Sequence, residues 1–265
     1  MAGPKQTSET TGSAAKSDFR ETWGKVPELT IGFWLLKIAA TTLGETGGDA
    51  VSMSMNLGYL VGTVIFSAIF LFAVTIQIRA KKFNPAIYWI TIVATTTVGT
   101  TLADFCDRSL GIGYLGGSLI LFTLVMLSLG SWYKTMGSIS VNTVAEPKAE
   151  LFYWVTIMFS QTLGTALGDW VADSGFGFGG GALLFLGLLA VVAILYFWTQ
   201  ISRTLLFWTA FILTRPLGAT VGDLFDKPHD QGGLAMSRYT ASAILIAFIV
   251  IGMYVLPHKP ARKAH

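Results

Sequence analysis

Four aspartates recur in this chain at one fixed distance from a tryptophan, and they are the residues whose type and spacing could do chemistry. Each Asp lies fifteen residues after its Trp, in a segment that is otherwise rich in apolar and small residues. The pairs are Trp34 and Asp49, Trp89 and Asp104, Trp154 and Asp169, and Trp208 and Asp223. Carboxylates in apolar segments are costly, so they normally face a bundle interior or a water-filled cavity. The spacing therefore predicts a buried acidic site that binds a cation, protons, or both.

The same four segments share a glycine ten residues after the Trp. These glycines are Gly44, Gly99, Gly164 and Gly218. Self-similarity of this kind is typical of a repeat architecture. Each copy is followed by an apolar run of about 20 residues, which is long enough to span a bilayer. We therefore predict four repeats of two helices each, at about 27–82, 83–146, 147–200 and 201–256.

The composition indicates a membrane protein, because 52% of the residues are apolar and only 12% are charged. The predicted fold class is all-α: a polytopic membrane bundle of eight transmembrane helices, in which the four repeats share a parallel orientation. We expect the repeated Trp to lie at the membrane interface as anchors, and the repeated Gly to allow close helix crossing. The predicted domains are a disordered cytoplasmic tail at 1–25, the membrane domain at 26–256 and a basic cytoplasmic tail at 257–265.

Basic residues predict the orientation. Thirteen of the eighteen Lys and Arg fall in the two tails and the loops between repeats: Lys5, Lys16, Arg20, Lys25, Arg79, Lys81, Lys82, Lys134, Lys148, Arg203, Lys259, Arg262 and Lys263. Cytoplasmic loops of membrane proteins carry such an excess. Both termini are therefore expected in the cytoplasm, and the acidic motifs are expected toward the opposite face.

Several functional classes are excluded by what the chain lacks. One cysteine, Cys106, excludes internal disulfides and a multi-cysteine metal site. The sequence holds no G-x-S-x-G, P-loop or H-E-x-x-H motif, so an enzyme is not expected. The net charge of +3 comes from loop residues and is no nucleic-acid signal. No tightly bound cofactor is expected, and the expected partners are the lipid bilayer, a metal ion and protons.

Positions that differ among the copies are where one asymmetric site would be built. Seven residues after the Trp stand Thr41, Thr96, Gln161 and Arg215, and eleven residues after it stand Glu45, Thr100, Thr165 and Ala219. The predicted cation ligands are Glu45, Asp49, Asp104, Asp169, Asp173, Asp223 and Gln161. Lys37 and Arg215 are predicted to be internal counter-charges that couple transport to protons. Met53, one turn beyond Asp49, would favour manganese over magnesium or calcium.

The leading hypothesis is a secondary transporter that exports a divalent metal cation, manganese first, with proton coupling. Two alternatives stay open. One is a membrane scaffold or sensor whose buried acids only hold the bundle together, and the other is a transporter of protons or of a small organic cation. The identity of the ion, the direction of transport and any homo-oligomer also stay open.

Four segments carry a family resemblance: TTLGETGGDAVSMS, TTTVGTTLADFCDRSLGIGY, SQTLGTALGDWVAD and TRPLGATVGDLFDKP. From Val26 to about Leu256 the chain resembles a bacterial family of membrane-anchored proteins built of four tandem two-helix repeats, of the repeat of unknown function 347 type. This resemblance implies a bacterial inner-membrane protein and brings no established chemistry. The E-T-G-G-D of residues 45–49 also resembles the acidic E-x-G-D elements of small manganese and calcium exporters, although the other three copies lack the Glu.

Overall fold

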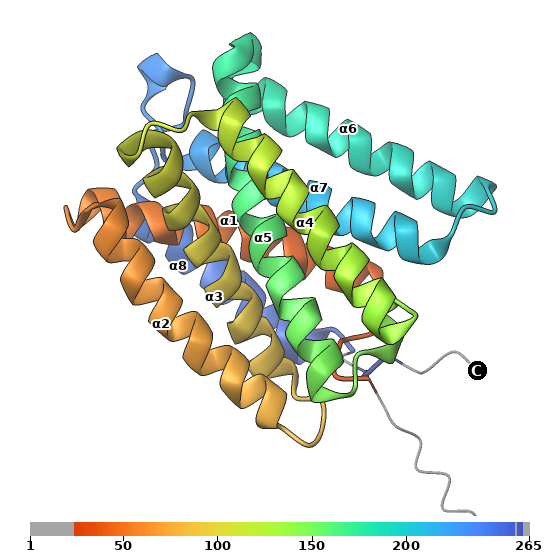
Figure 1. Cartoon of the computed structure of the whole chain (residues 1–265). Helices are drawn as coiled ribbons and strands as arrows, with labels where there is room; N and C mark the ends of the chain where they lie inside the picture. The colour runs from red at the N-terminus through yellow and green to blue at the C-terminus, as the bar shows by residue number, and fades with distance from the viewer. Residues whose placement is uncertain (1–23, 258, 262–265) are drawn as a thin grey trace, which may run out of the picture.

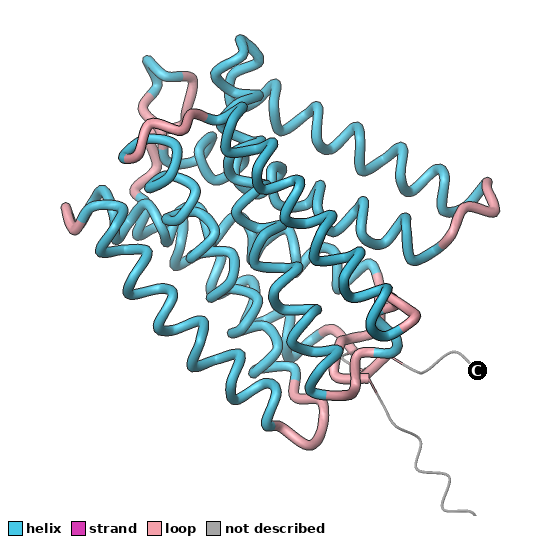
Figure 2. The backbone as a smooth tube through the Cα atoms, in the orientation of Figure 1, coloured by secondary structure: helices cyan, strands magenta, loops and turns pink. Residues whose placement is uncertain are grey.

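The computed structural model describes residues 24–257 and 259–261, and this part of the chain is helical almost throughout (Figure 2). The α-helices are α1 (Ile31–Asp49), α2 (Gly58–Arg79), α3 (Pro85–Asp104), α4 (Tyr114–Met136), α5 (Pro147–Val171), α6 (Gly177–Trp198), α7 (Arg203–Asp226) and α8 (Arg238–Val255). Three short π-helical segments extend α1, α3 and α5, namely η1 (Ala50–Ser54), η2 (Phe105–Ser109) and η4 (Ala172–Phe176). Two 3₁₀ turns, η3 (Val141–Thr143) and η5 (His229–Gln231), lie in loops. The predicted all-α class is confirmed.

Ordinary sequence signals begin and end these helices. The Thr30 hydroxyl accepts a hydrogen bond from the Phe33 amide at the start of α1, at 3.2 Å. Asn84 caps α3 in the same way, and Pro85 follows it as the first residue of the helix. Gly137 ends α4 in the left-handed conformation that favours glycine.

Six stretches in the described part of the chain are long and apolar enough to cross a membrane. They are Gly58–Arg79, Pro85–Ser109, Tyr114–Met136, Pro147–Trp198, Arg203–Asp226 and Arg238–Val255, and the fourth of these holds both α5 and α6. Large apolar side chains such as Phe72 and Leu183 are exposed on the outer helices, where lipid would cover them. The chain is therefore a helical membrane protein.

The first helices of the four repeats form a closed inner ring. α1 packs on α3, α3 on α5, α5 on α7, and α7 packs back on α1. Each outer helix packs mainly on the inner helix of the following repeat, so that α2 lies on α3, α4 on α5, and α6 on α7 (Figure 1). The last outer helix, α8, lies on α1. The ring is therefore completed by the fourth repeat, whose helices α7 and α8 pack on α1 of the first repeat.

The repeated glycines allow the inner helices to approach one another. A Cβ at each of them would collide with the seventh-position residue of the following repeat: Gly44 with Thr96, Gly99 with Gln161, Gly164 with Arg215, and Gly218 with Thr41. At Gly99 such a Cβ would lie 3.0 Å from the backbone of Gln161. The prediction that these glycines permit close helix crossing is confirmed.

The prediction that the repeated Trp are interfacial anchors is wrong for three of the four. Trp89, Trp154 and Trp208 are only 1–2% exposed. Their rings pack against Tyr88 and Tyr153 within the inner bundle. The physical reason is volume, because large rings are needed to fill this end of the ring. Trp34 is partly buried beside the same cluster.

Segments from both ends of the chain close the aromatic end of the bundle. Residues 24–28 and 259–261, here called the terminal clasp, are joined by hydrogen bonds from the Gly24 amide to the Ala261 carbonyl (3.1 Å) and from the Ala261 amide to the Val26 carbonyl (2.8 Å). Lys25 is buried and forms an ion pair with Glu150 at 2.6 Å. The remaining residues of the two predicted tails, 1–23, 258 and 262–265, lie outside the described residues.

We expect Gly99→Ala to destabilise the protein by about 1–3 kcal/mol, because the added methyl group overpacks the contact between α3 and α5. Gly130→Ala is the matched control, since an added Cβ there meets nothing within 4 Å and alanine favours the helix by about 1 kcal/mol. Thermal unfolding of both variants in detergent measures the difference. Equal stability of the two variants would contradict the packing described for the ring.

Candidate functional site

The four repeated aspartates and Glu45 are all buried at one end of the inner ring. The aspartates lie in the final turn of α1, α3, α5 and α7, and Glu45 lies one turn earlier on α1. Asp104 interacts electrostatically with Asp49, Asp169 and Glu45, and Asp223 does so with the same three residues. The structure therefore brings these five predicted ligands together from all four repeats.

Three of these carboxylates are close enough to share one cation. Glu45, Asp49 and Asp223 each offer an oxygen, and the three oxygens lie within 4.8 Å of one another. Oxygen atoms at this spacing suit hard divalent ions, which take carboxylate ligands at about 2.0–2.6 Å. Because the group contains only oxygen donors, it matches magnesium, calcium or manganese better than a softer metal.

A lysine occupies the space between two of the three carboxylates. The Lys227 ammonium lies 2.7 Å from Asp49 Oδ2 and 2.9 Å from Asp223 Oδ1. Burial alone lowers the pKa of Lys227, but the carboxylates of Asp223, Asp49 and Asp226 outweigh that effect and raise the pKa above its ordinary value. Lys227 is therefore a charged, resident cation within the acidic cluster.

Arg238, the first residue of α8, extends this network. Its guanidinium binds Asp226 and lies 3.7 Å from Asp49. Asp49 is thus approached by cations from two elements, while its second oxygen, Oδ1, has no hydrogen-bond partner in the described structure. This oxygen of Asp49 is therefore free to bind a further ligand.

The other half of the cluster is organised by Arg108 of η2. Its Nε lies 2.9 Å from Asp104 Oδ1, and its terminal nitrogen lies 3.3 Å from Asp169 Oδ2. Arg108 is about one-third exposed, so this bridge faces the rim of the bundle. Asp104 and Asp169 are therefore held as a second pair, on α3 and α5.

Arg215 lies at the centre of the ring. One terminal nitrogen of its guanidinium donates to Glu45 Oε2 (2.9 Å), Thr100 Oγ1 (2.5 Å) and Thr165 Oγ1 (2.6 Å). These acceptors belong to α1, α3 and α5, so a single side chain of α7 joins all four inner helices. At the eleventh position, where the other copies carry Glu or Thr, α7 carries Ala219. α7 therefore contributes no polar side chain at this position, and the Arg215 guanidinium is the group of α7 that bonds Glu45, Thr100 and Thr165.

The remaining predicted site residues have different surroundings. Gln161 is fully buried against Gly99, and neither the oxygen nor the nitrogen of its amide has a hydrogen-bond partner among the described residues. Lys37 is fully buried, with its ammonium 4.2 Å from the centre of the Phe211 ring. Asp173 is exposed on η4, and no ion pair of the described residues includes it. The structure thus gathers the other carboxylates but not Asp173.

Lys227, Arg108 and Arg238 were not among the residues predicted for the site. Two of them have a local signal, because Lys227 follows Asp223, and Arg108 follows Asp104, by four residues on a helix. Arg238 has no such signal, since the loop after α7 brings it back to Asp226. Its role follows from tertiary structure alone.

The charges of the cluster do not balance. Six buried carboxylates share ion pairs with four basic side chains, Arg108, Arg215, Lys227 and Arg238; the carboxylates are Glu45, Asp49, Asp104, Asp169, Asp223 and Asp226. Surplus negative charge in a low-dielectric site attracts cations or protons. The cluster can therefore take up positive charge beyond its own arginines and lysine.

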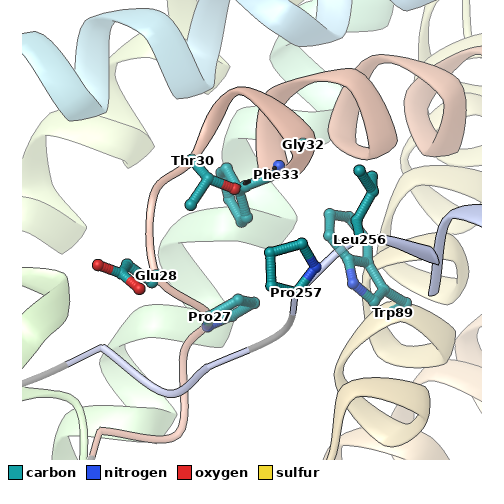
Figure 3. Close-up of a pocket in the computed structure, with 8 residues that line it drawn as sticks. All are labelled: Pro27, Glu28, Thr30, Gly32, Phe33, Trp89, Leu256 and Pro257. Carbon is teal, nitrogen blue, oxygen red and sulfur yellow. Dashed lines mark hydrogen bonds between the residues drawn. The ribbon is translucent and has the colours of Figure 1, made fainter. Parts of the chain in front are cut away.

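Two hollows found in the described structure lie away from this cluster. One of about 10 Å³ is at the aromatic end, with room for about one water (Figure 3). It is lined by Pro27, Glu28, Thr30, Gly32, Phe33, Trp89, Leu256 and Pro257. The other, of about 310 Å³, is an apolar groove of α4 and α5 lined by residues such as Leu127 and Val155, on a surface that lipid would cover.

Comparison with known proteins finds one family. The family described as Repeat of Unknown Function (DUF347) matches the chain four times in tandem, at residues 32–83, 87–138, 152–202 and 206–257. No curated protein and no solved structure matches. The four-repeat organisation predicted from the Trp, Gly and Asp spacing is confirmed.

We expect Lys227→Met to destabilise the protein by about 3–5 kcal/mol, because it leaves Asp49 and Asp223 buried without their shared cation. Adding Asp223→Asn should recover part of this loss, so the two changes should be non-additive. Chemical unfolding of the single and double variants measures the coupling. Lys82→Met, at an exposed loop lysine, is the control. Simple additivity would show that Lys227 does not hold the two carboxylates together.

Proposed function

This chain belongs to the DUF347 repeat family, and we propose that it is a secondary transporter that moves a divalent metal cation across the membrane in exchange for protons. The observation that carries the proposal is the triad of Glu45, Asp49 and Asp223, whose carboxylate oxygens lie within 4.8 Å of one another inside the bundle. These three residues would be the metal ligands.

In this proposal Lys227 is the internal competitor of the metal. Its ammonium binds two of the three carboxylates that the ion needs, so metal and ammonium exclude each other. When the metal enters, Lys227 leaves Asp49 and Asp223; Asp226, 4.0 Å from its ammonium, is the nearest alternative partner. When the metal leaves, Lys227 or protons neutralise the carboxylates again. The charge of this low-dielectric site stays nearly constant only if about two protons leave the carboxylates or Lys227 as the divalent ion enters and return as it departs. This release of protons would couple metal movement to proton movement.

For the membrane arrangement, we propose that all eight helices cross the bilayer and that the four repeats share one orientation. The repeated Gly contacts support this, because each repeat meets the following one through equivalent positions. α1 carries Lys37, Glu45 and Asp49, but all three are covered by neighbouring helices. The excess of basic residues in the tails and inter-repeat loops supports cytoplasmic termini in a bacterial inner membrane.

Manganese is the ion we propose first. The triad offers only oxygen ligands, which manganese shares with magnesium and calcium. We propose export as the direction of transport, because residues 45–49 resemble acidic elements of manganese and calcium exporters. Measuring the flux of manganese, magnesium and calcium in turn would show which ion the protein transports.

One observation favours a second function, that of a membrane scaffold without transport. Each of the six clustered carboxylates lies within 4.0 Å of a basic nitrogen, and a purely structural network would also show this. The two proposals differ in one respect: a scaffold needs the ion pairs to stay closed, whereas a transporter needs the pairs of Lys227 to open.

We expect Asp49→Asn to lower manganese flux about tenfold or more, because it removes the charge of one of three carboxylate ligands. The assay is purified protein in liposomes with a metal-sensitive dye and a pH-sensitive dye inside. Asp230→Asn is the matched control, because Asp230 is an exposed acid in η5 of the same chain. The wild type and the control should move metal one way and protons the other.

The outcomes separate the two functions. Wild-type flux in the folded Asp49→Asn variant would eliminate the triad as the transport site. If the wild-type protein moves none of the three ions while Asp49→Asn lowers its unfolding temperature, the scaffold function is the correct one.

A further inference from the structure

The apolar groove of about 310 Å³ on the outer surface lies between α4 and α5. Leu127 and Ser131 line it from α4, and Leu151 and Val155 line it from α5. All four side chains are exposed, so lipid meets this groove directly. The shape and chemistry of the groove suit an apolar chain.

The register between α4 and α5 shows where this groove ends. The Ser128 and Thr156 hydroxyls are hydrogen-bonded at 2.7 Å, and the Trp132 and Phe152 rings stack with their centres 6.4 Å apart. Four residues forward on α4 thus correspond to four residues back on α5, so the two helices are antiparallel. The end of α4 and the start of α5 therefore lie at the same end of the bundle (Figure 1).

Two lysines stand at that end of the groove, and both are exposed. Lys134, on the last turn of α4, follows Ser131 by three residues. Lys148, the second residue of α5, precedes Leu151 by three residues and Val155 by seven. Residues at these spacings share one face of a helix. At 1.5 Å of rise per residue, the two lysines lie about 9 and 12 Å from the hydroxyl pair, in the same direction.

The positive charge of these lysines is not compensated within the described part of the chain. No acidic side chain there forms an ion pair with either of them. Glu150, the acid in the first turn of α5, is buried and already paired with Lys25 at 2.6 Å. Glu146 lies two residues before Lys148, a spacing at which side chains do not face each other on a helix. The groove therefore ends in two positive charges that are free to bind an anion.

The cation on α5 is particular to the third repeat. Six residues before the repeated Trp, the four copies carry Glu28, Phe83, Lys148 and Ser202. Packing of the ring does not require a lysine at this position, since three copies lack it. A difference of this kind is expected where a site forms once per chain.

We propose that the groove and these two lysines bind one anionic phospholipid, with an acyl chain in the groove and the phosphate at the Lys134 and Lys148 ammonium groups. Lysine stems lie along apolar surface while their ammonium groups reach the level of the lipid headgroups. A zwitterionic lipid carries a cation of its own and gains less from two lysines. A soluble phosphate ester leaves the groove empty. The site is separate from the carboxylate triad and does not rest on metal transport.

The test is lipid binding by the full-length protein, purified in a neutral detergent and freed of bound lipid. Native mass spectrometry and thermal unfolding follow the addition of phosphatidylglycerol, of phosphatidylcholine with the same acyl chains, or of soluble glycerol phosphate. The wild type should bind one phosphatidylglycerol per chain and should then unfold a few degrees higher, saturably. Phosphatidylcholine should bind about tenfold more weakly, and glycerol phosphate should have no effect.

The double variant Lys134→Gln with Lys148→Gln should bind phosphatidylglycerol about thirtyfold more weakly, because both attractions to the headgroup are lost. Both lysines are exposed, so the fold should be retained. Lys81→Gln with Lys82→Gln is the matched control, since it removes the same charge from exposed loop lysines. A second variant, Val155→Trp, keeps both groove lysines but fills the groove, and should weaken binding about tenfold by displacing part of the acyl chain.

Three results would overturn the proposal. The first is equal binding of phosphatidylglycerol and phosphatidylcholine by the wild type. The second is a loss in the loop-lysine control as large as in the groove double variant, since binding would then follow general surface charge. The third is wild-type affinity in Val155→Trp, since the acyl chain would then lie elsewhere.

Discussion

The hydrogen bonds from the Arg215 guanidinium to three neighbouring helices are the interactions on which the rest of the structure depends. A fully buried guanidinium needs acceptors on several sides, and the closed ring of helices supplies Glu45, Thr100 and Thr165 together. Such a ring closes tightly only if side chains are absent where the helices cross, which explains the glycine beside Arg215 at Gly164. One buried cation therefore accounts for the polar centre and for the close packing around it.

Charge is layered along the ring. Aromatic rings fill one end, the basic residues Lys37 and Arg215 follow, and carboxylates gather at the other end with Lys227 among them. The ion pair of Arg215 with Glu45 joins the last two of these layers. Removing the charge of Arg215 alone would leave Glu45 buried without its partner, so Arg215 influences what the triad binds.

The repeat spacing was sufficient to predict the helical class, the four copies and the inward direction of the aspartates, because these depend on residues within one repeat. The packing of α2 on α3 rather than on α1 was not predictable, since it depends on contacts between repeats. The burial of Trp89, Trp154 and Trp208 was missed because tryptophan suits both a membrane interface and a core. The pairing of Lys227 with Asp223 can be predicted from their spacing of four residues. The pairing of Arg238 with Asp226 depends on the conformation of the loop after α7.

Each outer helix covers a helix of the following repeat, and this has a consequence for how such a chain could arise. A half-length protein with two repeats would leave one inner helix uncovered and one outer helix without a surface to cover. A second identical half supplies both missing surfaces, so two halves would complete the same ring as a symmetric dimer. Gene duplication and fusion of such a dimer would then free single positions, such as 215 and 219, to diverge without breaking the ring.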